Sequence, residues 1–176
     1  MDEKTDIETA KRAASRLAHS GDTLSSKELG DLGELAFVLA ATSKGLPVAK
    51  PFGDCRRYDL IVDSGRRLLR IQVKSAFSRS NRGSYQVQAS RHTAPTRLPY
   101  SADEIDFVAA YIAPRDIWYL VPVGVLLTGP CICLYPDGTK KKKDEGTARY
   151  EKYREAWHLL DERRKPSEET SGMQLR

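Results

Sequence analysis

The residues best suited to chemistry lie in a predicted β-hairpin, whose two strands are residues 58–63 and 67–74. Side chains alternate between the two faces of a strand. One face of this hairpin therefore collects four polar side chains, namely Asp59, Arg70, Gln72 and Lys74. A carboxylate, an amide oxygen and an ammonium at this spacing suit a hydrated divalent metal ion beside a phosphate.

The length of the turn decides which of these side chains face each other. Ser64 and Gly65 make a good two-residue turn, which would place Asp59 opposite Arg70 and diagonal to Gln72. A four-residue turn would place Asp59 directly opposite Gln72. Both registers bring the acid, the amide and the lysine into one polar cluster, whereas a three-residue loop would scatter them.

The distribution of charge indicates the kind of partner. The chain has a net charge of +5, but the window from Arg56 to Arg97 holds nine arginines, one lysine and only two acids, Asp59 and Asp63. That window carries +8, so the remainder sums to −3. Basic charge gathered around two acids is typical of a nucleic-acid surface, with a solvated cationic face as the alternative. The run Lys140–Lys143 is more typical of a solvated loop.

Composition and length exclude several classes of protein. The 176 residues, of which 40% are hydrophobic and 30% charged, predict one globular domain with a single core. No apolar run approaches the roughly 18 residues of a membrane span, and the polar N-terminus does not resemble a secretory signal. We therefore expect no membrane association and a cytoplasmic location. The three cysteines are too few for a disulfide framework, and we expect buried strand thiols rather than a zinc site.

Two helices are expected near the N-terminus. Apolar spacing predicts a peripheral, alanine-rich helix over residues 5–19. Ser25 and Glu28 form a capping box, in which each side chain satisfies a free backbone N–H. The helix that follows should run from about Ser26 to Lys44 and end before Gly45. Its expected buried stripe contains Leu29, Leu32, Ala36, Leu39 and Ala40.

The remaining pattern predicts strands followed by a helix. Beyond the hairpin we expect strands at residues 48–52, 85–88, 105–113, 117–123 and 131–135, a long loop at 91–104 and a helix at 148–160. The aromatic side chains of Phe107, Tyr111, Trp118 and Tyr119 are expected in the core rather than as base-stacking platforms. This order predicts an α/β or α+β fold with a mixed central sheet flanked by helices. We expect the domain at residues 25–161, the peripheral helix within 1–24 and a disordered tail at 162–176.

Three short segments together resemble the PD-(D/E)XK nuclease superfamily. They are Gly33-Glu34, Tyr58-Asp59-Leu60 and Ile71-Gln72-Val73-Lys74, in that order along the chain. The combination looks most like the branch of group I intron-associated homing endonucleases, in which Gln-x-Lys replaces acid-x-Lys. The resemblance covers about residues 25–123. It implies a restriction-endonuclease-like core, hydrolysis of DNA phosphodiester bonds with Mg²⁺ or alternatively Mn²⁺, double-stranded DNA as partner, and a homo-oligomer for cutting both strands.

The resemblance also implies roles for individual residues. Asp59 would be the principal metal ligand, Glu34 would reach the metal from its helix, and Gln72 would offer its carbonyl oxygen. Lys74 would orient the attacking water and offset charge at the phosphate. Gly30 and Gly33 would leave room for helix and sheet to approach. The residues expected to contact DNA are Arg56, Arg57, Arg70, Ser75, Arg79 and Arg82.

Two departures from the family pattern leave alternatives open. Position 58 is tyrosine rather than proline, on the opposite strand face, and Gln72 removes one negative charge from the metal site. The alternatives are a DNA-binding module without cleavage, a junction-resolving or repair nuclease, and a structural domain with an incidental basic face. For single residues, Asp59 could pair with Arg70, Glu34 could be an exposed helix acid, and Lys74 could be solvated at a strand end.

Overall fold

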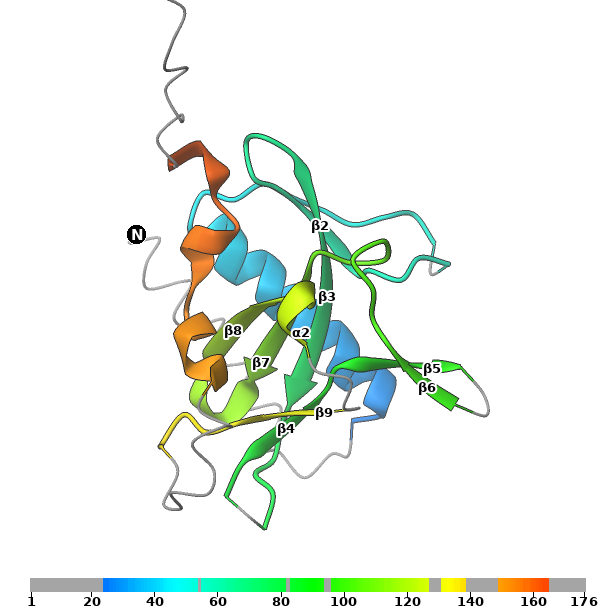
Figure 1. The fold of residues 1–176 in the computed structure, drawn as a ribbon, viewed down its shortest axis with the longest axis vertical. Coiled ribbons are helices and arrows are strands. Elements are labelled where there is room, and N and C mark those ends of the chain that lie inside the picture. The colour runs from blue at the N-terminus through cyan, green and yellow to red at the C-terminus, as the bar shows by residue number, and fades with distance from the viewer. Residues whose placement is uncertain are drawn as a thin grey trace, which may run out of the picture.

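A mixed five-stranded sheet forms the centre of the protein (Figure 1). The structure, a computed structural model, describes residues 24–53, 55–81, 83–93, 96–126, 131–138 and 149–164. In sheet order the strands are β1 (Val48–Ala49), β2 (Leu60–Asp63), β3 (Leu68–Ala76), β7 (Phe107–Ile112) and β8 (Ile117–Pro122). Strands β3 and β7 are parallel, and the other neighbours are antiparallel. With one α-helix on this sheet among the described residues, the α+β class with a mixed sheet is confirmed.

Helix α2 (Ser26–Thr42) begins at the predicted capping box. The Glu28 backbone N–H donates to the Ser25 hydroxyl at 3.3 Å, and the Ser25 backbone N–H donates to the Glu28 carboxylate at 2.7 Å. Gly45, with φ of 76°, follows its C-terminal end. The buried residues of the helix are Gly33, Phe37, Ala40 and Ala41. Of the predicted stripe only Ala40 is buried, because the helix packs on the sheet through the Gly33–Phe37 side.

The sheet has an apolar cluster on each face. Side chains alternate along β3, so Leu69, Ile71 and Val73 join the cluster that contains Phe37 of α2. Ala76 and Tyr119 belong to the second cluster, together with residues of β4 (Tyr85–Gln88) and β9 (Cys131–Leu134). The four aromatic residues predicted for the core are buried, and the Tyr111 and Trp118 rings stack with centroids 4.3 Å apart. The helix and the two small strands therefore cover opposite faces of one sheet.

Two small sheets flank the central one. Strand β4 (Tyr85–Gln88) pairs with β9 (Cys131–Leu134), and β5 (Ser90–Thr93) pairs with β6 (Thr96–Pro99). The prediction of a long loop at residues 91–104 was wrong for 91–93 and 96–99, which are in strands. A two-stranded ribbon buries little apolar surface, so its sequence lacks the alternation that marks a strand in a core. In Figure 1 the β5–β6 hairpin projects beyond the central sheet.

The C-terminal helix predicted at residues 148–160 was also wrong. Its described part contains short 3₁₀ turns such as Trp157–Leu159, and another 3₁₀ turn follows at Glu162–Arg164. Glu155 has a left-handed φ of 48°, and its carboxylate accepts hydrogen bonds from the Trp118 backbone N–H at 2.7 Å and the Trp157 indole at 2.8 Å. These contacts hold the segment on β8 in a shape that a continuous helix cannot adopt. Glu162, beyond the predicted boundary at 161, accepts a hydrogen bond from Ser64 at 3.0 Å.

The remaining predictions concern the cysteines, the segments outside the described residues and the membrane. The expectation of buried thiols was wrong, since Cys55 and Cys131 are exposed and Cys133 is half-buried, all three free. The helix at 5–19, Arg82, the lysine run 140–143 and the tail beyond residue 164 lie outside the described residues. Within the described ranges, no helix has the length and apolarity to cross a membrane.

Candidate active site

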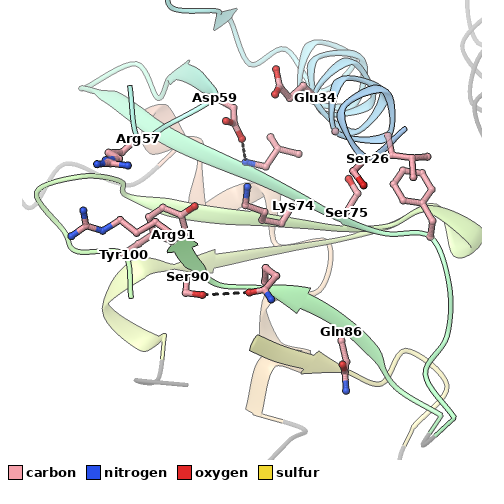
Figure 2. A pocket seen from close by; sticks show the side chains of 15 residues that line it. Ser26, Glu34, Arg57, Asp59, Lys74, Ser75, Gln86, Ser90, Arg91 and Tyr100 are labelled. Atoms are coloured by element: carbon pink, nitrogen blue, oxygen red, sulfur yellow. Dashed lines mark hydrogen bonds between the residues drawn. The ribbon is translucent and has the colours of Figure 1, made fainter. Parts of the chain in front are cut away.

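A pocket of about 730 Å³ opens between α2, the β2–β3 hairpin and strands β4 and β5 (Figure 2). Its lining includes three residues predicted for the site, Glu34, Asp59 and Lys74. Ser75 and Arg57 also line it, as do residues of the two small sheets. The helix acid and the hairpin acid therefore border one cavity, which is the arrangement that a shared site requires.

The register of the hairpin places Asp59 directly across from Gln72. Asp63 pairs with Leu68, which leaves a four-residue turn, and the Asp59 backbone N–H donates to the Ile71 carbonyl at 2.9 Å. The two-residue turn was wrong, and the four-residue alternative is confirmed. Hydrogen bonds within the turn explain the outcome. The Asp63 carboxylate accepts the Gly65 N–H at 2.8 Å, and the Ser64 N–H donates to the Arg67 carbonyl at 3.0 Å.

The carboxylate of Asp59 has one oxygen held by the protein. Its Oδ2 accepts hydrogen bonds from the Val73 backbone N–H at 2.7 Å and from the Gln72 amide. Burial raises the pKa of Asp59, although the nearby Lys74 charge and these hydrogen bonds act in the opposite direction. Within the described part of the chain, Oδ1 has no hydrogen-bond donor, so it is the oxygen available for a cation.

Lys74 presents its ammonium to the same space. It follows Gln72 by two positions in β3 and so emerges from the same face of the strand. Figure 2 shows its side chain extending toward Asp59 within the pocket. Lys74 also lowers the pKa of Asp59 by charge attraction. The acid and the lysine are thus neighbours on one side of the sheet.

Glu34 comes to the pocket from α2, and a close approach of helix and strand brings it there. A Cβ on Gly33 would lie 2.1 Å from the Ser75 hydroxyl oxygen, so a side chain at this position would displace either the helix or the Ser75 side chain. A Cβ on Gly30 would meet no atom within 4 Å, so the predicted packing role applies to Gly33 and not to Gly30. The Glu34 carboxylate pairs with the ammonium of Lys50 at 2.8 Å.

The donor set is compatible with a hard divalent cation. Asp59 and Glu34 supply carboxylate oxygens, and Mg²⁺ typically needs only one or two carboxylates beside water and phosphate. The Lys50 ammonium lies near three acids. Its hydrogen bond to Glu34, together with the negative charges of Glu34, Asp31 and Asp59, raises the pKa of Lys50. The described residues contain no group of three acidic, histidine or cysteine side chains suited to a metal. Gln72 directs its amide N–H to Asp59 and so acts here as a donor.

The predicted DNA-contacting arginines have different surroundings. Arg57 lines the pocket and Arg56 is exposed. Arg79 donates to the Gly83 carbonyl at 2.8 Å. Arg70 does not pair with Asp59, because its guanidinium is engaged by Asp106 at 3.0 Å and by the carbonyls of Ala102 and Asp103. Arg70 therefore anchors the segment between β6 and β7.

Among the pocket residues that sequence reasoning missed are Ser90, Arg91 and Tyr100. Ser90 and Arg91 begin the β5–β6 hairpin, and Tyr100 follows it. Because this stretch was predicted to be a loop, its residues could not be placed beside Asp59. The signal available was compositional: Arg91 lies within the positively charged window, and Tyr100 follows three positions after its end.

Comparison with known proteins agrees with this geometry. Residues 24–160 match the family model described as PD-(D/E)XK endonuclease. Among solved structures, the bacterial homing endonuclease I-Ssp6803I is similar with a TM-score of 0.64 and 33% identity. The alignment covers 78% of this chain and 92% of that one. No curated protein matches the chain significantly.

Proposed function

We propose that this chain, which belongs to the PD-(D/E)XK endonuclease family, hydrolyses phosphodiester bonds of double-stranded DNA with the help of Mg²⁺. The observation that carries the proposal is the shared pocket, in which Asp59, Lys74 and Glu34 meet. The homing endonuclease I-Ssp6803I, which the chain resembles over most of its length, supports DNA as the substrate. Mn²⁺ is the alternative cation.

Asp59 and Glu34 would hold the cation. When bound, such an ion polarises phosphoryl oxygens and lowers the pKa of a water molecule. Because Asp59 is largely buried, its carboxylate is stabilised by a nearby cation. The two N–H groups that donate to Oδ2 fix the orientation of the carboxylate. Gln72 would then contribute by orienting Asp59 rather than by supplying a third negative charge.

Lys74 would act on the phosphate itself. Its ammonium has three donors and no acceptor, and it lies in the pocket beside Asp59. A fixed positive charge there stabilises the negative charge that grows on the phosphoryl oxygens in the transition state. The same group can hold the attacking water by a hydrogen bond. Ser75, next along β3, would contact the DNA backbone.

The test is cleavage of supercoiled plasmid DNA by purified protein in Mg²⁺. Wild type is compared with Asp59→Ala, Lys74→Ala and, as a matched control, Arg115→Ala, which removes an exposed arginine paired with Asp137. Wild type and Arg115→Ala should cleave equally. Asp59→Ala and Lys74→Ala should each lose at least about 100-fold, the typical weight of one group that acts in the transition state. Equal cleavage by all four proteins would remove the assignment.

A DNA-binding module without cleavage is the second candidate. The neutral Gln72 favours it, because the site then has two acids where the family pattern provides a third. It predicts salt-sensitive DNA binding and no nicking in Mg²⁺ or Mn²⁺. A four-way DNA junction in the same assay separates a third candidate, since a junction-resolving enzyme would cut it in preference to linear duplex. Double-strand cleavage would further require two copies of the chain.

A further inference from the structure

Two arginines, Arg57 and Arg91, lie at an end of the pocket away from Glu34 (Figure 2), where they share one carboxylate. Arg57 precedes β2, and Arg91 belongs to β5. Their guanidinium nitrogens lie 3.9 Å and 3.2 Å from the same oxygen, Oε1 of Glu104. Both side chains line the pocket that contains Asp59 and Lys74. The fold therefore brings two positive charges from distant parts of the chain to one point beside the candidate active site.

The cluster of Arg57, Arg91 and Glu104 has an excess of positive charge and an N–H donor without an acceptor among the described residues. One carboxylate faces two guanidinium groups, and the pair with Arg57 is too long for a direct hydrogen bond. The Nε of Arg91 is buried and has no hydrogen-bond partner in the described ranges. Buried donors without acceptors are rare in folded proteins. An anion with several oxygens would give this N–H an acceptor once the guanidinium turns toward it.

Glu104 is held so that it positions the arginines rather than neutralises them. Its other oxygen, Oε2, accepts the Ser101 backbone N–H at 3.1 Å. Arg70 fastens the same segment through the Ala102 carbonyl at 2.6 Å and through Asp106. The side chain of Glu104 is only 17% exposed. Because it is anchored at one oxygen, Glu104 fixes the place of both guanidinium groups with the other.

Tyr100 adds a neutral donor between this cluster and Asp59. Burial, followed by the charge of Asp59, raises the pKa of Tyr100 to about 12. Its phenol therefore stays protonated at neutral pH, so that the hydroxyl can donate a hydrogen bond. Arg57 and Arg91 also act on this hydroxyl by charge. The pocket thus continues from Asp59 through Tyr100 to the two arginines.

We propose that Arg57 and Arg91 form a subsite for a second DNA phosphate, next to the phosphate that is cleaved, with Glu104 as their positioning residue. Guanidinium groups match the oxygens of phosphate in a fork geometry and remain charged. The identity of the anion as a DNA phosphate rests on the proposed function. The subsite would set the direction of the DNA strand across the pocket, because it lies at one side of Asp59 and Lys74 only.

The experiment measures binding to a fluorescein-labelled mixed-sequence duplex by anisotropy, in EDTA and over a range of NaCl concentrations. The proteins are wild type, Arg57→Ala, Arg91→Ala, Arg91→Lys, the Arg57→Ala/Arg91→Ala double variant and Arg115→Ala as the control. Each alanine variant should bind about tenfold more weakly, the weight of one hydrogen bond to a charged group. Each should also lower the slope of log K against log salt by about one, because Glu104 neutralises the arginine that remains and the cluster loses its net positive charge.

The double variant distinguishes a shared phosphate from two separate contacts. If both arginines hold the same phosphate, its salt slope should fall by about one rather than about two. Arg91→Lys should keep the wild-type slope and still bind more weakly, because an ammonium lacks the fork. Arg115→Ala should match wild type. A wild-type slope in Arg91→Ala, or a drop of about two in the double variant, would overturn the subsite.

Failure of the subsite and failure of the nuclease proposal give different results. Binding in EDTA does not depend on cleavage, so a protein that never nicks plasmid can still show the expected salt slopes. A wild type that cleaves DNA while Arg57→Ala and Arg91→Ala bind normally keeps the nuclease proposal and rejects the subsite. A wild type that binds no duplex rejects both. Thermal unfolding checks each variant, and Arg57→Ala with Arg91→Lys suffices if Arg91→Ala does not fold.

Discussion

The Gln72 amide donates a hydrogen bond to the Asp59 carboxylate across the β2–β3 hairpin. The Val73 backbone N–H donates to the same oxygen, so two donors from adjacent residues fix one acid. Gln72 is only 5% exposed. A buried amide in this place orients Asp59 without adding charge, whereas an acid in this place would need a cation between the two carboxylates.

Gln72→Glu should make the fold depend on metal. Without metal, a second carboxylate would face Asp59 in place of a donor, and the loss of this hydrogen bond should cost about 1–3 kcal/mol of unfolding free energy. Mg²⁺ should restore the loss, because it binds the folded site and not the unfolded chain. Urea unfolding in EDTA and in Mg²⁺ measures both effects.

Gln86→Glu is the matched control, since Gln86 also lines the pocket but is exposed on β4. It should change stability by less than about 0.5 kcal/mol in either buffer, as is usual for a surface position. Equal losses by the two variants in EDTA, or no recovery of Gln72→Glu in Mg²⁺, would contradict the arrangement described for Asp59.

Asp59→Asn should abolish cleavage and stabilise the protein at neutral pH. Burial raises the pKa of Asp59 in the folded state. The stability that its carboxyl contributes is therefore complete below the ordinary aspartate pKa and declines as pH rises through the folded value. Asparagine retains an oxygen for the Val73 N–H and carries no charge. The free energy of unfolding should rise by on the order of 1 kcal/mol at pH 7, which is typical of a single stabilising substitution.

The measurement is the melting temperature at neutral pH and again in acid below the aspartate range. The difference between Asp59→Asn and wild type should be largest at neutral pH and vanish in acid. Asp63→Asn alters an exposed acid of the same hairpin and should show no such gain. A gain for Asp59→Asn that persists unchanged in acid would mean that the buried charge is not its cause.

Lys50→Met should increase the affinity of the site for Mg²⁺. The Lys50 ammonium holds the Glu34 carboxylate at 2.8 Å, and a metal ion must compete for the same oxygen. The Lys50 side chain is 65% exposed, which weakens the pair, so its removal should lower the Mg²⁺ concentration for half-maximal plasmid cleavage by about two- to fivefold. Lys44→Met is the control, since Lys44 lies over the Trp157 ring. An equal effect of both substitutions would show that general charge, and not the Glu34 contact, is responsible.

Gly33→Ala should weaken both the fold and the site although it removes no functional group. Its Cβ would lie 2.1 Å from the Ser75 hydroxyl oxygen, so α2 or Ser75 must shift, at a cost of about 1–3 kcal/mol. In the Gly33→Ala/Ser75→Ala double variant the remaining Ser75 Cβ lies 3.4 Å away, an ordinary contact, and stability should recover. Chemical denaturation measures this coupling.

Gly30→Ala serves as the comparison within the same helix. A Cβ there meets no atom within 4 Å, so the variant should gain up to about 1 kcal/mol from helix propensity. If Gly33→Ala were as stable as Gly30→Ala, the close approach of α2 to β3 would not be the reason for a glycine at position 33.

Local signals identified the elements that carry the candidate site. The capping box placed the start of α2, and strand alternation placed Asp59, Gln72 and Lys74 on one face, because both rules depend only on neighbouring residues. The turn length could not be chosen from sequence, since Ser64 and Gly65 suit a two-residue turn. Contacts with the distant Glu162, whose carboxylate accepts from Ser64, belong to the four-residue turn that formed.

The sequence by itself determined the chemistry available in this protein: a helix acid, a hairpin acid with an amide and a lysine, and a window of positive charge. Only the tertiary structure decided which groups meet. It paired Arg70 with Asp106 and Lys50 with Glu34. It also brought Arg91 of the β5–β6 hairpin, whose sequence lacks an apolar pattern, and the following Tyr100 to the pocket. The physical reason is that helix capping and side-chain alternation in strands depend on neighbouring residues, whereas ion pairs and pocket walls join residues far apart in the chain.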